Sequence, residues 1–456
     1  MSHSRVVRPL AAAVAGVYLL VVAGATAAVA NAARACSTWP LCTGGLTVTT
    51  AIAAGHRLAA AAVGLLVVGV AVRAWPRVDR RVRAALALAV LLYPVQIAVG
   101  GAVAVTGGGF GGAHLAVGIG IFGALTLALA WQLEAETGTD DAPAGEPVRD
   151  LPEVEAAPAR TPTYDSWVDR AVGTLRAYAR LTKPRLMWLL CLVAAAGMAL
   201  AAGPSLSVRT VVATLTGGVL AIGASGTFNH VLERDVDRRM ARTSDRPVAT
   251  HVVPVRNAVA FGIALAALSL IAFLQVNALA AALGFVAIVF YSLIYTLLLK
   301  PNTVQNTVIG GAAGALPALI GWAAVTGRVG VPGALLAGVV FLWTPAHFYN
   351  LALAYREDYE RGGFPMLPVV RGETVTRKHI LLYLAATLAA AAALGAVTGL
   401  GPVYAATTVA FGAAFLWAVV RLHRERTERA AFRAFHASNA YLGALLLAVV
   451  VDALAV

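Results

Sequence analysis

Side chains able to hold a metal ion and phosphate groups gather in one short segment, GTFNHVLERDVDRRMARTSDRPV. Asn229, Glu233 and Asp237 recur every four residues, so a continuing helix would place three oxygen ligands on one face. Such ligands suit Mg²⁺, which usually takes one or two protein carboxylates together with water and substrate phosphate. Arg242 and Arg246 follow, and guanidinium groups bind phosphate oxygens bidentately. The segment therefore predicts a site for Mg²⁺ and a diphosphate.

A second acidic segment, HFYNLALAYREDYERGGFPMLPVVRG, contains Glu357 and Asp358. Two acidic patches on one membrane face could hold a diphosphate through metal ions and neutralise its charge as it departs. Lys300 and Arg356 are candidate diphosphate contacts, although both are equally explained as cations anchored at a membrane surface. His347 begins the same segment, where it has either a functional or a helix-packing role.

The elements that position these residues are expected to be membrane spans. The chain has 456 residues, is 59% hydrophobic and has a mean hydropathy of +0.78, which excludes a soluble globular protein. Stretches of about 18 to 25 apolar residues recur, each long enough to cross a hydrocarbon core of roughly 30 Å as a helix. Thirteen are expected: residues 9–31, 51–73, 84–105, 113–133, 186–203, 209–228, 257–275, 278–298, 306–326, 332–350, 380–399, 402–420 and 436–454.

The placement of positive charge predicts the topology. The net charge of +13 would suggest a nucleic-acid partner in a soluble protein, but here it concentrates in alternate loops, and no nucleic-acid partner is expected. A cytoplasmic N-terminus puts most Lys and Arg residues inside and leaves only a few outside, such as Arg34, Arg209 and Arg328. The C-terminus then lies outside, in a multi-pass protein of the cell membrane. The first span is too long for the core of a signal peptide.

A break in the apolar pattern divides the chain. Residues 134–178 are rich in Pro, Ala and acidic residues and lack helical periodicity, so they are interpreted as a cytoplasmic linker. The expected domains are a four-span domain over residues 1–133 and a nine-span domain over residues 179–456. The predicted fold class is an all-α polytopic membrane protein, with a four-helix transmembrane bundle followed by a nine-helix bundle.

The front domain contains two histidines inside expected spans, where a polar side chain is costly. His56 and His114 lie at similar depth, so two imidazoles could coordinate a heme iron from both sides, and Arg57 could meet a propionate. The alternative is that each histidine caps a helix or bonds a neighbouring span. Cys36 and Cys42 share one short outer loop and could form a disulfide or a redox pair.

Three stretches of this domain, CSTWPLCTGG, AGHRLAAAAVGLL and YPVQIAVGGAVAVTGGGFGGAHLAVG, resemble one half of the heme A synthase family. The resemblance implies heme binding by His56 and His114. Ala53 replaces a family glutamate proposed to be catalytic, and the cysteines are one residue closer than usual, so oxidation of heme O by this domain alone is not expected. Heme delivery, heme sensing and heme A formation with a separate heme A synthase partner stay open. A half-sized fold also suggests a homo-oligomer.

The rear domain resembles the intramembrane UbiA-type prenyltransferases, and within them the heme farnesyltransferase (heme O synthase) family. The resemblance rests on YARLTKPRLM, NHVLERDVDRRMARTSDRP, YTLLLKPNTVQNTVIGGAAGALPALIGWAAVTG and TPAHFYNLALAYREDYERGGFPMLPVVRG. Its motifs imply metal binding and catalytic roles for Asn229, Glu233, Asp237 and Asp358, and the neighbouring acid Glu357 of the second acidic segment is predicted as a further metal ligand. They imply catalytic roles also for the paired arginines Arg242 and Arg246 and for His347.

The resemblance implies a reaction. Farnesyl diphosphate ionises on Mg²⁺, a vinyl group of heme B attacks the farnesyl cation, and water completes a hydroxyethylfarnesyl substituent. His347 could ligate the heme iron or direct the water, and the membrane-embedded wall would keep other water away. The alternatives are a UbiA-type enzyme with a quinone-precursor or lipid acceptor, and a non-enzymatic heme transporter or electron-transfer subunit.

Overall fold

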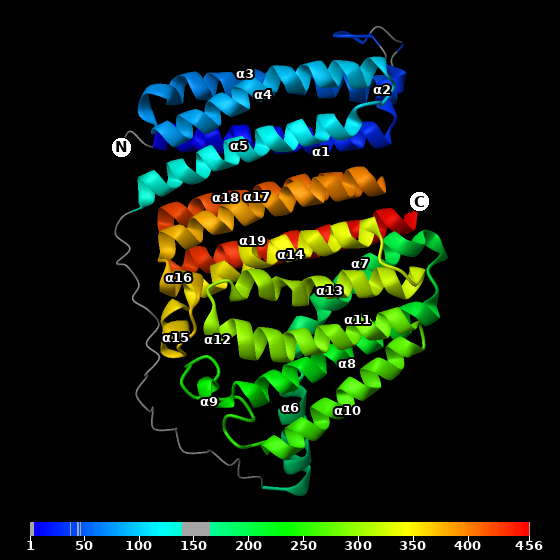
Figure 1. Ribbon diagram of the computed structural model, residues 1–456, viewed down its shortest axis with the longest axis vertical. Helices are drawn as coiled ribbons and strands as arrows, with labels where there is room; N and C mark the ends of the chain where they lie inside the picture. Colours follow the sequence, from blue (N-terminus) through cyan, green and yellow to red (C-terminus); the bar gives the residue numbers. More distant parts are fainter. Residues whose placement is uncertain (1–3, 37, 43–44, 46, 139–164, 456) are drawn as a thin grey trace. The chain divides into compact units, whose positions relative to one another are not determined.

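The computed structural model describes residues 4–36, 38–42, 45, 47–138 and 165–455, and all regular elements in these ranges are helices. Within them, thirteen helices are long and apolar enough to cross a membrane, as expected (Figure 1). The prediction of an all-α, multi-pass membrane protein is therefore confirmed. Most of the predicted linker, residues 139–164, lies outside the described residues.

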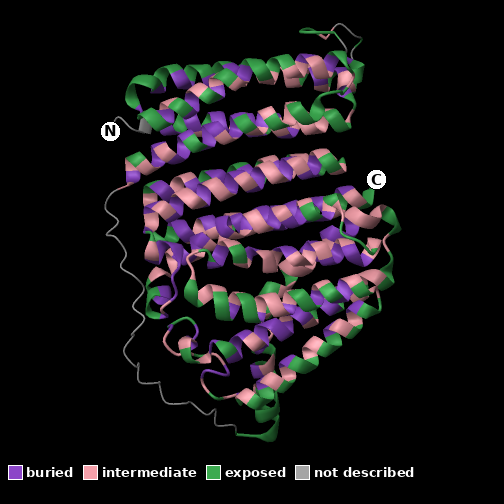
Figure 2. Ribbon diagram, in the orientation of Figure 1, coloured by how far each residue is buried: buried purple, intermediate pink, exposed green. Residues whose placement is uncertain are grey.

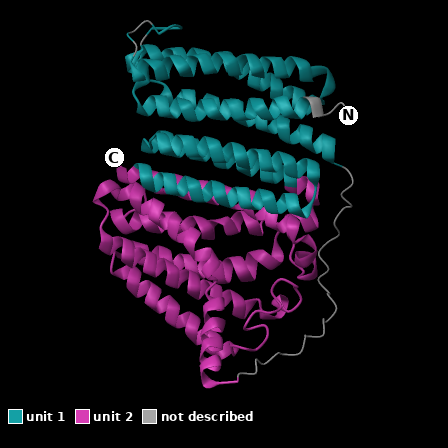
Figure 3. Cartoon of the chain, turned by 180° about the vertical axis from the view of Figure 1, so that it is seen from behind, with its two compact units in different colours: residues 1–140, 377–452 teal, residues 141–376, 453–456 magenta. Residues whose placement is uncertain are grey.

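The chain forms two compact units, coloured separately in Figure 3. Unit 1 comprises residues 1–140 and 377–452, and unit 2 comprises residues 141–376 and 453–456. Most of the last three spans thus group with the front helices. The expected division at residues 133 and 178 stays a prediction.

Unit 1 is a set of antiparallel spans. Its helices are α1 (Ser4–Val29), α2 (Ala32–Ala35), α3 (Val48–Ala74), η1 (Trp75–Arg77), α4 (Arg80–Val105), α5 (Gly111–Thr137), most of α17 (Glu373–Thr398), α18 (Pro402–Glu425) and most of α19 (Glu428–Ala455). Helix α1 packs against α3, α5 and α18, and α4 packs against α5. The front spans are therefore held partly by α18, which is distant in sequence.

Unit 2 contains the predicted metal and phosphate residues. Its helices are α6 (Trp167–Leu181), α7 (Pro184–Ala202), η2 (Gly203–Ser205), α8 (Val208–Leu232), α9 (Arg234–Asp237), α10 (Val255–Leu274), α11 (Ala278–Val289), the π-helical η3 (Phe290–Leu299), α12 (Lys300–Asn302), α13 (Asn306–Thr326), α14 (Val331–Ala354), α15 (Arg356–Arg361) and α16 (Leu367–Val370).

Glycines let these spans approach closely. A Cβ on Gly321 of α13 would lie 2.1 Å from the carbonyl oxygen of Ala194 in α7, and one on Gly197 would lie 2.5 Å from that of Ala318. Small residues at such contacts are what membrane helices need, because van der Waals packing drives their association. Exposed residues continue along the length of α10 (Figure 2), on a face suited to lipid.

Helix α6 was not expected, because residues 167–178 were assigned to a linker without helical periodicity. Ser166 caps the helix by accepting a hydrogen bond from the backbone N–H of Asp169 at 3.1 Å. Ala177 and Leu181 are buried in a cluster with Val231. The expectation was wrong because this segment was grouped with the Pro-rich stretch before it, whereas residues 167–181 are amphipathic at helical spacing and burial of Ala177 and Leu181 stabilises the helix.

Candidate functional site

The first predicted motif lies where α8 ends. The helix stops at Leu232 and the one-turn helix α9 follows, so the condition of a helix that continues through Asp237 is not met. The helical spacing nevertheless persists, because the Glu233 N–H donates to Asn229 O at 2.9 Å and the Asp237 N–H donates to Glu233 O at 2.7 Å. All three side chains are buried, at 2%, 5% and 2% exposure. The structure thus brings the three predicted ligands together.

Cations surround the two carboxylates. Lys300 Nζ lies 2.6 Å from Glu233 Oε1, and Arg246 Nη1 lies 2.8 Å from each carboxylate oxygen of Asp237. The same Arg246 nitrogen is 3.7 Å from Glu233 Oε2, so one guanidinium links both acids. Buried charges require partners of this kind because removing them from water is costly.

Lys183 completes the group and was missed by sequence reasoning. Its ammonium donates to Asn229 Oδ1 and, at 3.3 Å, to the hydroxyl of Tyr291. Asn229 Nδ2 in turn donates to Thr296 Oγ1 at 3.2 Å. Lys183 occupies the left-handed region, at φ 53°, just before the Pro that begins α7. The available signal was a lysine beside the proline that opens a span.

The electrostatics of the group are those of buried, coupled charges. Burial lowers the pKa of Lys183 to about 7, with Arg246 adding to the effect. Burial would raise the pKa of Glu233, but Lys300 and Lys183 outweigh it and hold that pKa below its ordinary value. Burial raises the pKa of Asp237 despite the opposing effect of Arg246. The group combines two acids with three cations, so it can receive further negative charge.

Asp358 of the second predicted motif lies against the same loop. Its carboxylate accepts hydrogen bonds from the backbone N–H of Ala241 at 2.8 Å and of Arg242 at 3.3 Å, and it pairs with Arg361 at 3.0 Å. Asp358 is buried whereas Glu357 is exposed. In the structure Asp358 therefore fixes the loop that follows the first motif, and metal binding by either acid stays a prediction.

The remaining predicted residues lie as follows. The Arg242 guanidinium sits over the rings of Tyr355 and Tyr359, at 5.2 Å and 5.6 Å. Arg356 pairs with Glu373 at 3.5 Å. His347 lies two turns before the end of α14, stacked on Trp343 with ring centroids 4.2 Å apart. Sequence reasoning missed the two tyrosines because aromatic residues are enriched at membrane surfaces in general, whether or not they serve a site.

An apolar cavity opens beside Lys183 and Tyr291 and runs between α7, α8, α10, α11 and α13. The empty space in and around it, counted together with open solvent, is about 750 Å³. Deeper in, its lining includes Thr214, Phe273 and Ile320. A charged mouth above an apolar cavity suits an amphiphilic ligand with an anionic head and a hydrocarbon tail.

In unit 1 the structure brings His56 and His114 together, with ring centroids 6.3 Å apart. Gly24 and Gly100 leave room for the rings, because a Cβ there would lie 3.3 Å and 3.0 Å from them. The Nδ1 atoms of both rings are buried, without a hydrogen-bond partner among the described residues. Gln96 contacts His114 Nε2 at 3.3 Å. The arrangement can offer imidazole nitrogens to a metal.

The loop before α3 contains a Cys36–Cys42 disulfide, one of the two states left open by the sequence. Arg57 donates to the carbonyl oxygens of Cys36, Thr38 and Pro40 at 2.9, 2.8 and 3.2 Å. Its guanidinium thus stabilises this loop, and contact with a propionate stays a prediction.

Comparison with known proteins gives a consistent result. The pattern of the UbiA prenyltransferase family matches residues 189–443. A protein of Haloarcula marismortui named protoheme IX farnesyltransferase is 65% identical over 463 residues, covering 100% of both chains. Another, named protoheme IX farnesyltransferase 1, from Saccharopolyspora erythraea, is 46% identical over 284 residues, which cover 61% of this chain and 90% of that protein.

A solved structure from work on digeranylgeranylglyceryl phosphate synthase in membranes covers 62% of this chain and 100% of its own. The TM-score is 0.53 at 15% identity, which is a likeness of fold alone.

Proposed function

Because this chain belongs to the UbiA prenyltransferase family, we propose that it transfers a farnesyl group from farnesyl diphosphate to a vinyl group of heme B, giving heme O. The observation that carries the proposal is the group of two buried acids and three cations at the mouth of an apolar cavity. Relatives similar over the whole chain, named protoheme IX farnesyltransferase, support heme as the acceptor.

The donor set fits Mg²⁺. Asn229, Glu233 and Asp237 supply one amide oxygen and two carboxylates, and Mg²⁺ typically completes such a set with water and substrate phosphate. When bound, Mg²⁺ supplies positive charge that neutralises the diphosphate as the allylic C–O bond breaks.

The protein's own cations bind and orient the diphosphate. Lys183, Arg246 and Lys300 pair with the proposed metal ligands in the structure, so their positive charges lie where they would bind the phosphate oxygens beside a bound Mg²⁺. Arg242, stacked on its two tyrosines, contributes a further guanidinium. The bond electrons leave with the diphosphate, and these cations stabilise that charge.

The apolar cavity keeps water from the farnesyl group until the acceptor reacts. The heme vinyl group forms a carbon–carbon bond to the allylic carbon. Water then adds to the porphyrin side and loses a proton, which leaves a hydroxyethylfarnesyl substituent. His347 either ligates the heme iron or directs this water; a His347→Ala variant that makes heme O at the wild-type rate contradicts both roles.

One assay tests the proposal. Membranes containing the protein are incubated with heme B, farnesyl diphosphate and Mg²⁺. The extracted hemes are then separated by chromatography and identified by mass spectrometry. We expect heme O. Farnesylation of a quinone precursor or a lipid instead would show a different acceptor, and no farnesylation at all would favour a heme transporter or electron-transfer subunit.

For the front helices we propose heme B bound between His56 and His114. The facing imidazoles with free Nδ1 atoms support this ligation. Ala53 stands where the heme A synthase family, which the front domain resembles, has a glutamate proposed to be catalytic. Heme delivery or sensing therefore fits this domain better than heme A formation without a partner. Bis-histidine heme absorption that survives in a His56→Ala, His114→Ala double variant would refute the assignment.

We further propose that the diphosphate site faces the cytoplasm of the cell, with the N-terminus on the same side. A Ser244→Cys variant should react with a membrane-impermeant maleimide in inside-out vesicles only; reaction in intact cells reverses the orientation. A separate heme A synthase or a second copy of this chain is a further proposed partner. If the protein purifies as a monomer, without a heme A synthase, from membranes that contain that enzyme, both partner proposals are excluded.

A further inference from the structure

The apolar cavity has a measurable depth. Its lining residues on α8 run from Gly226 at the mouth to Thr214, which is twelve residues, or about 18 Å along a helix. On α7 they run from Lys183 to Ala194, which is eleven residues, or about 16 Å. Two independent helices thus give a depth of about 17 Å at a rise of about 1.5 Å per residue.

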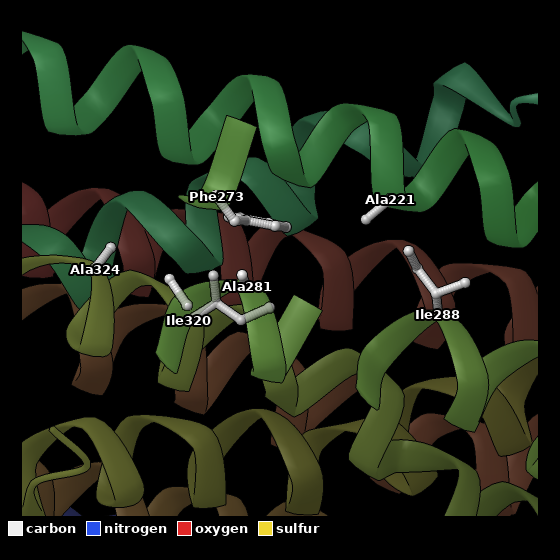
Figure 4. Close-up of a cluster of buried hydrophobic side chains, with 7 residues drawn as sticks. Ala221, Phe273, Ala281, Ile288, Ile320 and Ala324 are labelled. Carbon is white, nitrogen blue, oxygen red and sulfur yellow. The ribbon is translucent and has the colours of Figure 1, made fainter. Parts of the chain in front are cut away.

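Phe273 lies at the deep end. It comes from the last turn of α10 and is 0% exposed, in a buried cluster with Ala221, Ala281 and Ile320 (Figure 4). Gly217 of α8, which faces this ring, is nine residues from Gly226, or about 13 Å along the helix. The ring therefore lies about 13 Å below the mouth, and of the lining residues on α8 only Thr214 and Leu215 lie deeper.

Two glycines hold the ring in place. A Cβ on Gly217 would lie 2.8 Å from the ring of Phe273, and one on Gly284 of α11 would lie 2.5 Å from it. The ring is thus enclosed by two backbones, and rotation away from the cavity would require the helices to separate. A fixed aromatic ring makes a hard floor, because close-packed interiors do not deform continuously.

An extended isoprenoid advances about 1.25 Å per carbon–carbon bond of about 1.5 Å. Because the methyl branches do not lengthen it, a fifteen-carbon farnesyl tail spans about eleven bonds, or about 14 Å, and a twenty-carbon tail about fifteen bonds, or about 19 Å. We propose that Phe273, fixed by Gly217 and Gly284, limits the prenyl donor to fifteen carbons. This inference rests on the proposed prenyl transfer and adds the residue that selects the donor.

Two variants test the proposal, one by lengthening the cavity and one by shortening it. Phe273→Ala removes the floor, so we expect the ratio of kcat/KM for geranylgeranyl over farnesyl diphosphate to rise at least tenfold. Gly218→Leu fills the cavity from α8, where an added Cβ meets nothing within 4 Å, so we expect farnesyl use to fall at least tenfold relative to geranyl. Phe415→Ala is the control, because it deletes an equally buried ring in unit 1.

Affinities of the purified variants for farnesyl and geranylgeranyl thiolodiphosphates provide a readout that needs no acceptor. Wild-type donor ratios and affinities in both cavity variants would overturn the inference while heme O formation still supports the proposed function. Failure of the wild type to prenylate heme, with donor affinities that shift as expected, would overturn the acceptor and leave the floor standing. If Phe273→Ala does not fold, the milder Phe273→Leu takes its place, and an unchanged ratio of geranylgeranyl to farnesyl use in that variant overturns the inference.

Discussion

Replacing Asp237 by Asn removes one charge from the centre of the candidate site and keeps the shape of the side chain. Both Asp237 oxygens lie 2.8 Å from Arg246 Nη1, and the residue is 2% exposed. After the change Glu233, at 3.7 Å, is the one carboxylate that still pairs with Arg246 among the described ion pairs. The variant therefore loses a proposed metal ligand and weakens the cluster that holds it.

The expected losses of kcat and of folding stability in Asp237→Asn follow from two separate effects. Removing one electrostatic stabiliser of a transition state typically costs about 10² to 10³ in kcat, or roughly 3 to 4 kcal/mol. Breaking a buried ion pair can cost about 3 to 5 kcal/mol of stability, but Asn can still accept a hydrogen bond and the Arg246 side chain is 18% exposed, so we expect about 1 to 3 kcal/mol. The loss of transition-state stabilisation should therefore equal or exceed the loss of folding stability.

The assay is heme O formation in membranes, with the absorption of the front-domain heme as a check on folding. Asp245→Asn is the matched control, because Asp245 pairs with Arg180 at 2.6 Å where both side chains are exposed, and such pairs contribute about 0 to 1 kcal/mol. We expect wild-type rates for the control and loss of turnover for Asp237→Asn. A kcat for Asp237→Asn close to that of the control would refute the metal site.

Further outcomes follow from the same geometry. Asp358→Asn should raise KM for farnesyl diphosphate about tenfold through loss of the charge-assisted bonds to Ala241 and Arg242, and an unchanged KM would contradict its loop-fixing role. Chelation of divalent cations should abolish heme O formation and added Mg²⁺ should restore it; turnover in chelator would rule out the metal. His56→Ala should remove bis-histidine heme absorption while heme O formation persists, and parallel loss of both would show that the front helices are needed for transfer.

The sequence alone determined the class of protein and the chemistry of one segment. Thirteen apolar stretches must become helices, because the bilayer offers no other partner for backbone N–H and C=O groups. Asn229, Glu233 and Asp237 recur at helical spacing, so even a broken helix keeps them together through local hydrogen bonds. Local periodicity was sufficient for both results.

Only the tertiary structure decided which distant residues join that segment. Lys183 and Lys300 reach the site from other helices. Asp358, which the sequence suggested as a metal ligand, accepts a hydrogen bond from the backbone of the loop in the structure. The cavity floor at Phe273 likewise depends on glycines from two neighbouring helices. Spacing along a chain records which side chains share one helix face, whereas contacts between helices arise from packing that no single segment encodes.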